Sequence, residues 1–393
     1  MSFDAKEFIS PVIKELPPSG IRRFFGLAAE MENVISLGVG EPDFVTPDKF
    51  KNAAITSLQA GKTGYTANAG LIELREAISD YLATRFDVHY DPNHEIIVTV
   101  GGSEAIDISL RSIISPGDEV LLPEPCFVSY RPCIIMAGGV PVTIETSSEN
   151  GFKLTPEMLE AKITPKTKAI LMNYPNNPCG GIMTKEDLEA IVPVILKHNL
   201  IVISDEIYAE LTYEGTHTSI ASLPGMKERT ILISGVSKAF AMTGWRIGYV
   251  CANKDFYEQM YKIHQYIIMS APTMGQYAAI EAFKNGQEEV KVMVAEYKKR
   301  RDLITRRFRE AGLTIFQPMG AFYAFPSIQV TGLSSEEFCM RLLNEKRVAV
   351  VPGYPFGACG EGFIRCSYAY STEHIEEACN RIEEFVQEIL ASK

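Results

Sequence analysis

The middle of the sequence repeats one pattern, in which a short apolar run is followed by a stretch with helical spacing. The seven apolar runs cover residues 96–100, 119–122, 141–144, 169–173, 200–204, 231–234 and 247–251. Several are continuous runs of Ile, Val and Leu, which is typical of strands covered on both faces. Strands that alternate with helices are joined by right-handed crossovers. The pattern therefore predicts an α/β domain with a mainly parallel sheet over residues 46–284.

Helix signals support this alternation. Residues 184–198 have helical spacing, with Thr184 as a good N-cap residue and Asp187 three positions later, as in a capping box. A longer, highly charged helix is expected from about residue 285, and Gly312 stands where a C-cap glycine would end it.

The two flanking regions differ from the core. Residues 1–45 are rich in proline and glycine, which favours an extended N-terminal arm, and we expect it to contribute to the smaller domain. After the long helix come an apolar segment at 320–326, a helix at 334–345, strands at 348–351 and 363–368, and a final amphipathic helix. This order predicts a smaller α+β domain over residues 285–393.

Composition excludes several classes of function. The 393 residues carry 49 acidic and 38 basic side chains, for a net charge of −11, which argues against nucleic acid or an anionic membrane as a partner. The basic residues at 298–301 are interpreted as the solvated face of the long helix. The eight cysteines form no CxxC pair and the six histidines are scattered, so we expect reduced thiols and no metal site. The N-terminus lacks a signal-peptide pattern, which predicts a cytoplasmic protein.

Polar residues follow four of the predicted strands, where an open parallel sheet binds its ligands. Gly102 and Ser103 follow the first run and open a helix, whose free N–H groups favour an anion. Asn177 lies in a proline-rich loop after the run at 169–173, and Asp205 and Tyr208 follow the run at 200–204. Each of these signals alone is also compatible with an ordinary loop or helix cap.

The stretch after the run at 231–234 is the most informative. It reads GVSKAFAMTGWRIG and places Lys238 among apolar residues, with Arg246 eight positions later. A desolvated ammonium has a lowered pKa and becomes a usable nucleophile. The four strand ends together supply an anion site, an amide, a carboxylate with a phenol, and a lysine with an arginine. Pyridoxal phosphate (PLP) uses this set, because its aldehyde, phosphate, pyridine nitrogen and ring oxygen each need one of these partners.

The sequence resembles the class I/II aminotransferases of the aspartate aminotransferase superfamily, which are PLP enzymes of fold type I. The resemblance rests on LGVGEPDF at 37–44, on the lysine motif above and on FIRCSYA at 363–369. It is nearest to the bacterial and archaeal branch that contains aspartate, aromatic and N-acetyl-diaminopimelate aminotransferases. It implies a large domain with a mainly parallel seven-stranded sheet, a smaller α+β domain, a homodimer, and PLP as the cofactor.

The resemblance also implies roles for residues at the cofactor ring. Lys238 would bind the aldehyde and then act as the general acid and base, Asp205 would pair with the pyridine nitrogen, and Asn177 and Tyr208 would hydrogen-bond the ring oxygen. Phe127 occupies the position of the aromatic residue that stacks on the pyridine ring, although it is also compatible with a plain core residue.

Further roles follow at the phosphate and at the substrate. Arg246 would hold the phosphate with Gly102, Ser103 and Ser237, and Tyr65 would reach the phosphate of the partner subunit, unless it is an ordinary turn residue. Arg365, with Gly40 beside it, would bind the substrate α-carboxylate in a bidentate pair. The alternative for Arg365 is an ordinary arginine on the surface of a sheet. Asn177 is also expected to contact the substrate.

Two positions depart from the pattern of relatives. Gly235 stands where many relatives have serine, so Ser237 is left to supply a hydroxyl to the phosphate. Ser103 stands where some aspartate-preferring relatives carry a lysine, which weakens the case for a dicarboxylate substrate.

The expected function is therefore ping-pong transfer of an amino group from an L-amino acid, such as aspartate or an aromatic amino acid, to a 2-oxo acid such as 2-oxoglutarate. A PLP-dependent C–S β-lyase of the same fold remains the alternative, because the two classes share every cofactor contact named above. A non-catalytic regulator is disfavoured. Regulators of this fold carry an added basic DNA-binding domain, and we find no such domain in this sequence.

Overall fold

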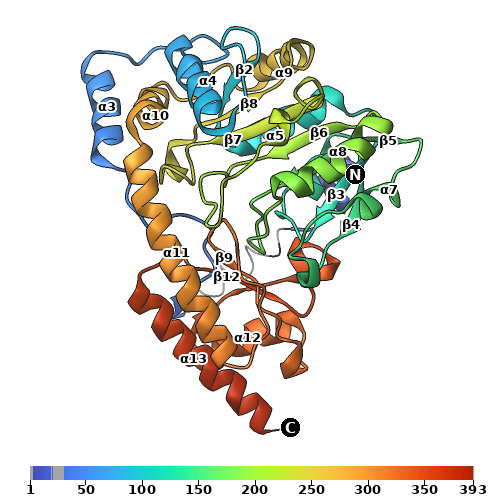
Figure 1. The fold of residues 1–393 in the computed structure, drawn as a ribbon, viewed down its shortest axis with the longest axis vertical. Coiled ribbons are helices and arrows are strands. Elements are labelled where there is room, and N and C mark those ends of the chain that lie inside the picture. The colour runs from blue at the N-terminus through green and yellow to red at the C-terminus, as the bar shows by residue number, and fades with distance from the viewer. Residues whose placement is uncertain (1–2, 19, 21–30, 393) are drawn as a thin grey trace.

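The computed structural model describes residues 3–18, 20 and 31–392. Its largest sheet has seven strands, β2 to β8, which lie in the upper part of Figure 1. The strand order is β2-β8-β7-β6-β5-β3-β4. These strands are β2 (Ile96–Thr99), β3 (Glu119–Glu124), β4 (Val140–Glu145), β5 (Thr167–Asn173), β6 (Ile201–Asp205), β7 (Thr230–Gly235) and β8 (Gly248–Cys251). Only β8 runs antiparallel to its neighbours in this sheet. The seven apolar runs are thus confirmed as strands of one mainly parallel sheet.

Helices cover both faces of this sheet, which explains the continuous apolar runs. On one face, Ile97 and Val250 pack with α5 (Gly101–Ile113) and α9 (Lys254–Ile267). On the other face, the adjacent residue Ile96 packs with α4 (Ile72–Phe86) and α10 (Thr273–Asn285). Successive side chains of a strand point to opposite faces, so each residue of β2 is buried.

The predicted helix at 184–198 is confirmed as α8 (Lys185–Lys197). The Thr184 hydroxyl accepts from the Asp187 N–H at 3.3 Å, and the Asp187 carboxylate accepts from the Thr184 N–H at 2.8 Å. Both halves of the capping box are therefore present. With α7 (Pro156–Glu160), this helix covers the part of the sheet formed by β5 and β6.

The C-terminal part contains the predicted mixture of helices and short strands. The long helix α11 (Gln287–Glu310) leads into it (Figure 1), and Gly312 follows with φ +85°, a conformation that suits glycine. The remaining elements are β9 (Tyr323–Ala324), α12 (Ser335–Lys346), β10 (Val348–Ala349), β11 (Val351–Pro352), β12 (Ile364–Ser367) and α13 (Thr372–Ala391).

The expected single strand at 348–351 is two strands that belong to different sheets. β10 pairs in parallel with β1 (Ile35–Ser36), and β11 pairs antiparallel with β12 in the sheet β11-β12-β9. The prediction of one strand was wrong because a continuous apolar run does not show where the chain changes its pairing partner.

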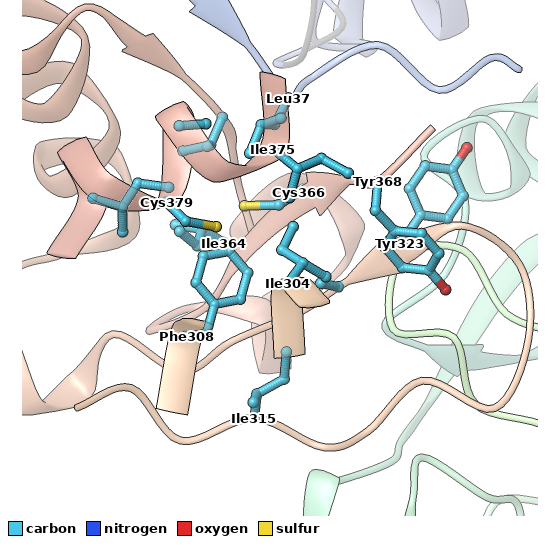
Figure 2. Close-up of a cluster of buried hydrophobic side chains, with 14 of the residues drawn as sticks. Leu37, Ile304, Phe308, Ile315, Tyr323, Ile364, Cys366, Tyr368, Ile375 and Cys379 are labelled. Atoms are coloured by element: carbon cyan, nitrogen blue, oxygen red, sulfur yellow. The ribbon is translucent and has the colours of Figure 1, made fainter. Parts of the chain in front are cut away.

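The N-terminal segment packs onto this C-terminal part. Leu37 lies in the same apolar cluster as Phe308, Ile364 and Ile375 (Figure 2). Before it, the described residues form a short helical turn, η1 (Ala5–Phe8), and the helix α1 (Pro11–Glu15), while residues 21–30 of the expected arm lie outside the described residues. The division of the chain at residues 45 and 284 stays a prediction.

A membrane-spanning helix would need a long apolar stretch. Within the described ranges, no helix has both the length and the apolar character that crossing a membrane requires.

Candidate active site

The site lies at the carboxyl ends of β5, β6 and β7, as the strand-end argument predicts. Asn173 and Asp205 are register partners at the ends of β5 and β6, and the Asn173 side chain donates to the Asp205 carbonyl oxygen at 2.8 Å. Lys238 follows β7 by three residues. Parallel strands bring their carboxyl ends to one edge, and this brings together residues that are far apart in the sequence.

Asp205 is a buried carboxylate, and within residues 3–18, 20 and 31–392 its hydrogen-bond donors are neutral. Its Oδ2 accepts from the Tyr130 hydroxyl at 2.6 Å, and its Oδ1 accepts from the Ile207 N–H at 3.1 Å. Burial raises the pKa of Asp205 to about 6. A buried carboxylate is stabilised by a cationic partner, and the protonated pyridine nitrogen of PLP is such a partner.

Tyr130 is a residue that the sequence analysis missed. It begins α6 (Tyr130–Met136) and is buried, with 1% of its surface exposed. Its position three residues after Phe127 is the one available signal, because both residues follow the carboxyl end of β3.

Lys238 is held in a polar contact inside an apolar pocket. Its Nζ donates to the Gly40 carbonyl oxygen at 2.6 Å and lies 5.9 Å and 5.7 Å from the ring centroids of Tyr208 and Phe322. Burial, and next the positive charge of Arg365, lower the pKa of Lys238 to about 8. A substantial neutral fraction of this amine is therefore available near physiological pH.

Tyr208 lies beside Lys238 and shares a hydrogen bond with a second missed residue. The hydroxyl oxygens of Tyr208 and Tyr323 are 2.8 Å apart. Burial raises the pKa of the Tyr208 hydroxyl well above its ordinary value. Tyr208 is therefore protonated and can donate a hydrogen bond to an anionic oxygen.

One nitrogen of the Arg365 guanidinium is buried without a partner among the described residues. Arg365 Nη1 donates to Asn177 Oδ1 at 3.1 Å and its Nη2 donates to the Gly38 carbonyl oxygen at 2.6 Å. Its Nε is buried and has no hydrogen-bond partner in the part of the chain that the structure describes. The guanidinium lies over the rings of Tyr323 and Phe356, at 4.7 Å and 5.0 Å. With 4% of its surface exposed, Arg365 is not an arginine on an open sheet surface. A buried unpaired donor on a cation indicates a site for an anion.

The residues that are expected to bind the phosphate lie near the point where β2 leads into α5. Gly101 opens the helix with φ +71°, and a Cβ atom there would overlap the guanidinium of Arg246. Arg246 is held by donation from Nη1 to the Thr243 carbonyl oxygen at 3.0 Å. Gly102 and Ser103 occupy the first turn, where backbone N–H groups have no partner within the helix. This combination of a cation and a helix N-terminus favours a phosphate.

The three remaining predicted residues, Ser237, Phe127 and Tyr65, differ in how far they are buried. Ser237 is buried next to Lys238. Phe127 is half-buried and meets the ring of Tyr130 edge-on at 5.5 Å, which puts it near Asp205. Tyr65 is 84% exposed.

The side chains gathered at this site are chemically suited to bind PLP. Lys238 offers an amine of lowered pKa. Among the described residues, Asp205 is a buried carboxylate that no cation contacts by a hydrogen bond, and the Arg365 Nε is buried without a partner. Over residues 3–18, 20 and 31–392, no group of three or more His, Cys, Asp or Glu side chains is placed to hold a metal ion.

Comparison with known proteins gives relatives along nearly the whole chain. The family model described as aminotransferase class I and II matches residues 32–382. The chain is 55% identical to the putative aminotransferase YugH of Bacillus subtilis over 96% of this chain and 98% of that protein. It is 48% identical to an aspartate aminotransferase of Pyrococcus abyssi, over 94% of this chain and 96% of the relative. It is 44% identical to the aromatic-amino-acid aminotransferase 2 of Thermococcus litoralis, over 97% and 98%.

Solved structures agree with these relatives. The aromatic aminotransferase from Pyrococcus horikoshii matches with a TM-score of 0.89 and 46% identity, covering 94% of this chain and 99% of the other. The aspartate aminotransferase from Thermus thermophilus with maleate matches with a TM-score of 0.92 and 38% identity, covering 96% and 99%. The chain therefore belongs to the class I and II aminotransferases, enzymes that depend on PLP and have fold type I.

Proposed function

We propose that this aminotransferase moves the amino group of an L-amino acid to a 2-oxo acid such as 2-oxoglutarate by a ping-pong mechanism. The observation that carries the proposal is the placement of Lys238, whose Nζ donates to the Gly40 carbonyl oxygen at 2.6 Å and whose pKa is lowered to about 8 by burial and by the positive charge of Arg365. A base and an anion-binding cation are thus offered to one substrate, whose α-carboxylate and Cα proton lie on the same carbon.

The residues around Asp205 would hold the cofactor ring. PLP, when bound, supplies an electron sink for the negative charge that develops at the substrate Cα. Asp205 would keep a proton on the pyridine nitrogen, and Phe127 would stack on the ring. Tyr208 and Asn177 would donate to the ring oxygen, and Asn177 is suited to this because its Oδ1 already accepts from Arg365, which leaves its Nδ2 to donate.

Lys238 would move the proton at Cα. A neutral amine keeps a lone pair while one of its N–H groups donates to the Gly40 carbonyl oxygen. The base would therefore be oriented without losing the electron pair that accepts the proton.

Arg365 would bind the substrate carboxylate, with the backbone of Gly40 alongside. Its unpaired Nε and its planar fork support a bidentate pair with a carboxylate. At the other end of the site, Arg246, Gly102, Ser103 and Ser237 would hold the phosphate.

We further propose a homodimer, in which Tyr65 reaches the phosphate of the partner subunit. Tyr65 and Tyr266 are both 84% exposed, and Ile267 and Met269 are 49% and 46% exposed. The loop that carries Tyr65 is joined to the segment just after the end of α9 by a hydrogen bond of 2.7 Å from the Asn68 side chain to the Met269 carbonyl oxygen. Exposed apolar side chains gathered in this way support an interface. Sedimentation equilibrium of the wild type should give twice the chain mass, and a stable monomer would contradict the proposal.

The amino donor is proposed to be aspartate, an aromatic amino acid or a related compound, because relatives carry the names of aspartate and aromatic aminotransferases. A panel of donors with 2-oxoglutarate tests this choice. Full turnover by Lys238→Ala with any of these donors would contradict the mechanism.

The β-lyase alternative is not favoured, because the relatives are named aminotransferases. The two reactions separate when enzyme and amino acid are mixed without an oxo acid. Transfer then stops after one equivalent of amino acid per site, whereas a lyase would release pyruvate and ammonia continuously.

We propose a cytoplasmic location, which the free state of all eight cysteines supports, since thiols persist in reducing compartments.

A further inference from the structure

Tyr323 connects the C-terminal part to the catalytic residues. It lies on β9, where it pairs with Ser367 of β12, two residues after Arg365. Residues two apart on a strand share a face, so Arg365 is a diagonal neighbour of Tyr323 and its guanidinium lies 4.7 Å from the ring centroid. Tyr323 belongs to the apolar cluster of Figure 2, yet its hydroxyl reaches Tyr208.

The close approach of Gly40 fixes the Tyr323 hydroxyl. A Cβ atom on Gly40 would lie 2.6 Å from the Tyr323 hydroxyl oxygen, so only glycine leaves room for it. That hydroxyl has two acceptors within reach, Tyr208 at 2.8 Å and the Gly40 carbonyl oxygen at 3.4 Å. The Gly40 carbonyl already accepts from Lys238 at 2.6 Å. Distance and competition both favour Tyr208 as the acceptor.

The count of protons decides the direction of the shared hydrogen bond. Each phenol has one proton. If Tyr208 gives its proton to the ring oxygen of the cofactor, the hydrogen bond between the two tyrosines needs the proton of Tyr323. The result is a chain in which Tyr323 donates to Tyr208 and Tyr208 donates to the cofactor, and bonds in such a chain strengthen one another.

We propose that Tyr323 is a positioning residue that strengthens the hydrogen bond from Tyr208 to the cofactor ring oxygen. This inference rests on the proposed roles of Lys238 and Tyr208. It assigns a function to a residue of the C-terminal part that contacts Tyr208, Gly40 and Arg365 at once.

The test is a pH titration of the visible absorption band of the enzyme loaded with PLP. In the loaded enzyme, the ring oxygen would share a proton with the Lys238 nitrogen, and loss of this proton would be the step that the titration follows. A hydrogen-bond donor to the ring oxygen weakens that oxygen's attraction for the proton. Losing the donor should therefore raise the midpoint of the titration. Tyr208→Phe should raise it by about one pH unit, and Tyr323→Phe by about 0.2 to 0.5 unit. The double variant should match Tyr208→Phe, because Tyr323 acts only through Tyr208.

Tyr174→Phe is the matched control. Tyr174 is also a buried tyrosine, and its hydroxyl donates to the Phe152 carbonyl oxygen at 2.9 Å. Its midpoint should equal that of the wild type. If Tyr323→Phe shifts no more than this control, or if the double variant shows the sum of the two shifts, the proposal is wrong.

Gly40→Ala provides a second perturbation that leaves the tyrosine intact. The added methyl group displaces the Tyr323 hydroxyl and should raise the midpoint in the same direction, and an unchanged midpoint would contradict the proposal. Failure of the proposed function is a distinct result, since the wild type would then show no visible band that Lys238→Ala abolishes.

Discussion

The hydrogen bond between Tyr130 and Asp205 supports a prediction whose size follows from the structure. Tyr130→Phe keeps the ring and removes the hydroxyl that donates to Asp205 Oδ2 at 2.6 Å. A hydrogen bond to a charged group contributes about 1.5–3 kcal/mol, and one pKa unit corresponds to about 1.4 kcal/mol. The pKa of Asp205, raised by burial to about 6, should therefore rise by a further one to two units, to between about 7 and 8.

This shift changes the charge of the site near neutral pH. In the wild type without cofactor, a pKa of about 6 leaves Asp205 mostly ionised at about pH 7. In Tyr130→Phe, half or more of the carboxyl groups would carry a proton at that pH. A neutral carboxyl group no longer stabilises a proton on the pyridine nitrogen, so affinity for PLP should also fall.

The assay is an infrared titration of the protonated carboxyl band in the cofactor-free protein, with Asp205→Asn to identify the band. Tyr174→Phe serves as the control for loss of a buried hydroxyl. A midpoint in Tyr130→Phe within about 0.3 pH unit of the wild type would refute the reasoning, because the 2.6 Å contact would then contribute almost nothing to the ionised form.

The same pKa sets the sign of a stability effect. The folded-state pKa of Asp205 lies above its ordinary value of 3.8, so the folded state binds this proton more tightly than the unfolded state. The stabilisation from that proton is present at low pH and is lost as the pH rises through about 6. In Tyr130→Phe the loss should continue to higher pH, so its melting temperature should fall below that of the wild type mainly above pH 6.

Three further predictions concern the remaining parts of the site. In the cofactor-free protein, acylation of Lys238 followed by mass spectrometry should be half-maximal near pH 8, because burial lowers its pKa to about 8; a midpoint near the ordinary 10.5 would contradict this. Arg365→Lys keeps the positive charge but loses the planar guanidinium, so KM for the amino acid should rise about 10- to 100-fold with a smaller change in kcat. The control is Arg381→Lys, which alters an ion pair with Glu377 outside the site and should leave KM unchanged. Gly101→Ala places a methyl group against the Arg246 guanidinium, which is expected to bind the phosphate, so PLP should dissociate at least about ten times faster. The control is Gly117→Ala, because Gly117 also has a positive φ but has open space around it. Equal dissociation rates in the two variants would show that the clash with Arg246 is irrelevant.

The main sheet could be predicted from sequence because its signal is local. Burial on both faces requires apolar residues at successive positions, and β2 and β8 are buried at every residue. No knowledge of the pairing partner is needed to recognise such a run. Residues 348–351 lack that advantage, since the change from the partner β1 to the partner β12 occurs inside one apolar stretch.

The same limit applies to the candidate site. Asn177, Asp205 and Lys238 could be singled out because each follows a recognisable strand. Tyr130 and Tyr323 could not, because their hydroxyl partners lie 75 and 115 positions away in the sequence. In sequence a buried tyrosine looks like any other core aromatic residue. Its partner is known only once the fold places Tyr130 beside the end of β6 and Tyr323 beside Tyr208.

The segment at residues 37–41 binds Lys238 and Arg365 through its backbone, and this affects how the enzyme tolerates mutation. The Gly38 carbonyl accepts from Arg365, and the Gly40 carbonyl accepts from Lys238. No substitution can delete a backbone carbonyl group, so a change of side chain at residue 38 or 40 does not remove either hydrogen bond directly. Substitutions should matter instead where they change the path of the backbone. Gly40 is one such position, because an added methyl group meets Tyr323, and Leu37 is another, because it holds the segment in the apolar core. Sequence variation in this segment should therefore be limited by shape rather than by charge.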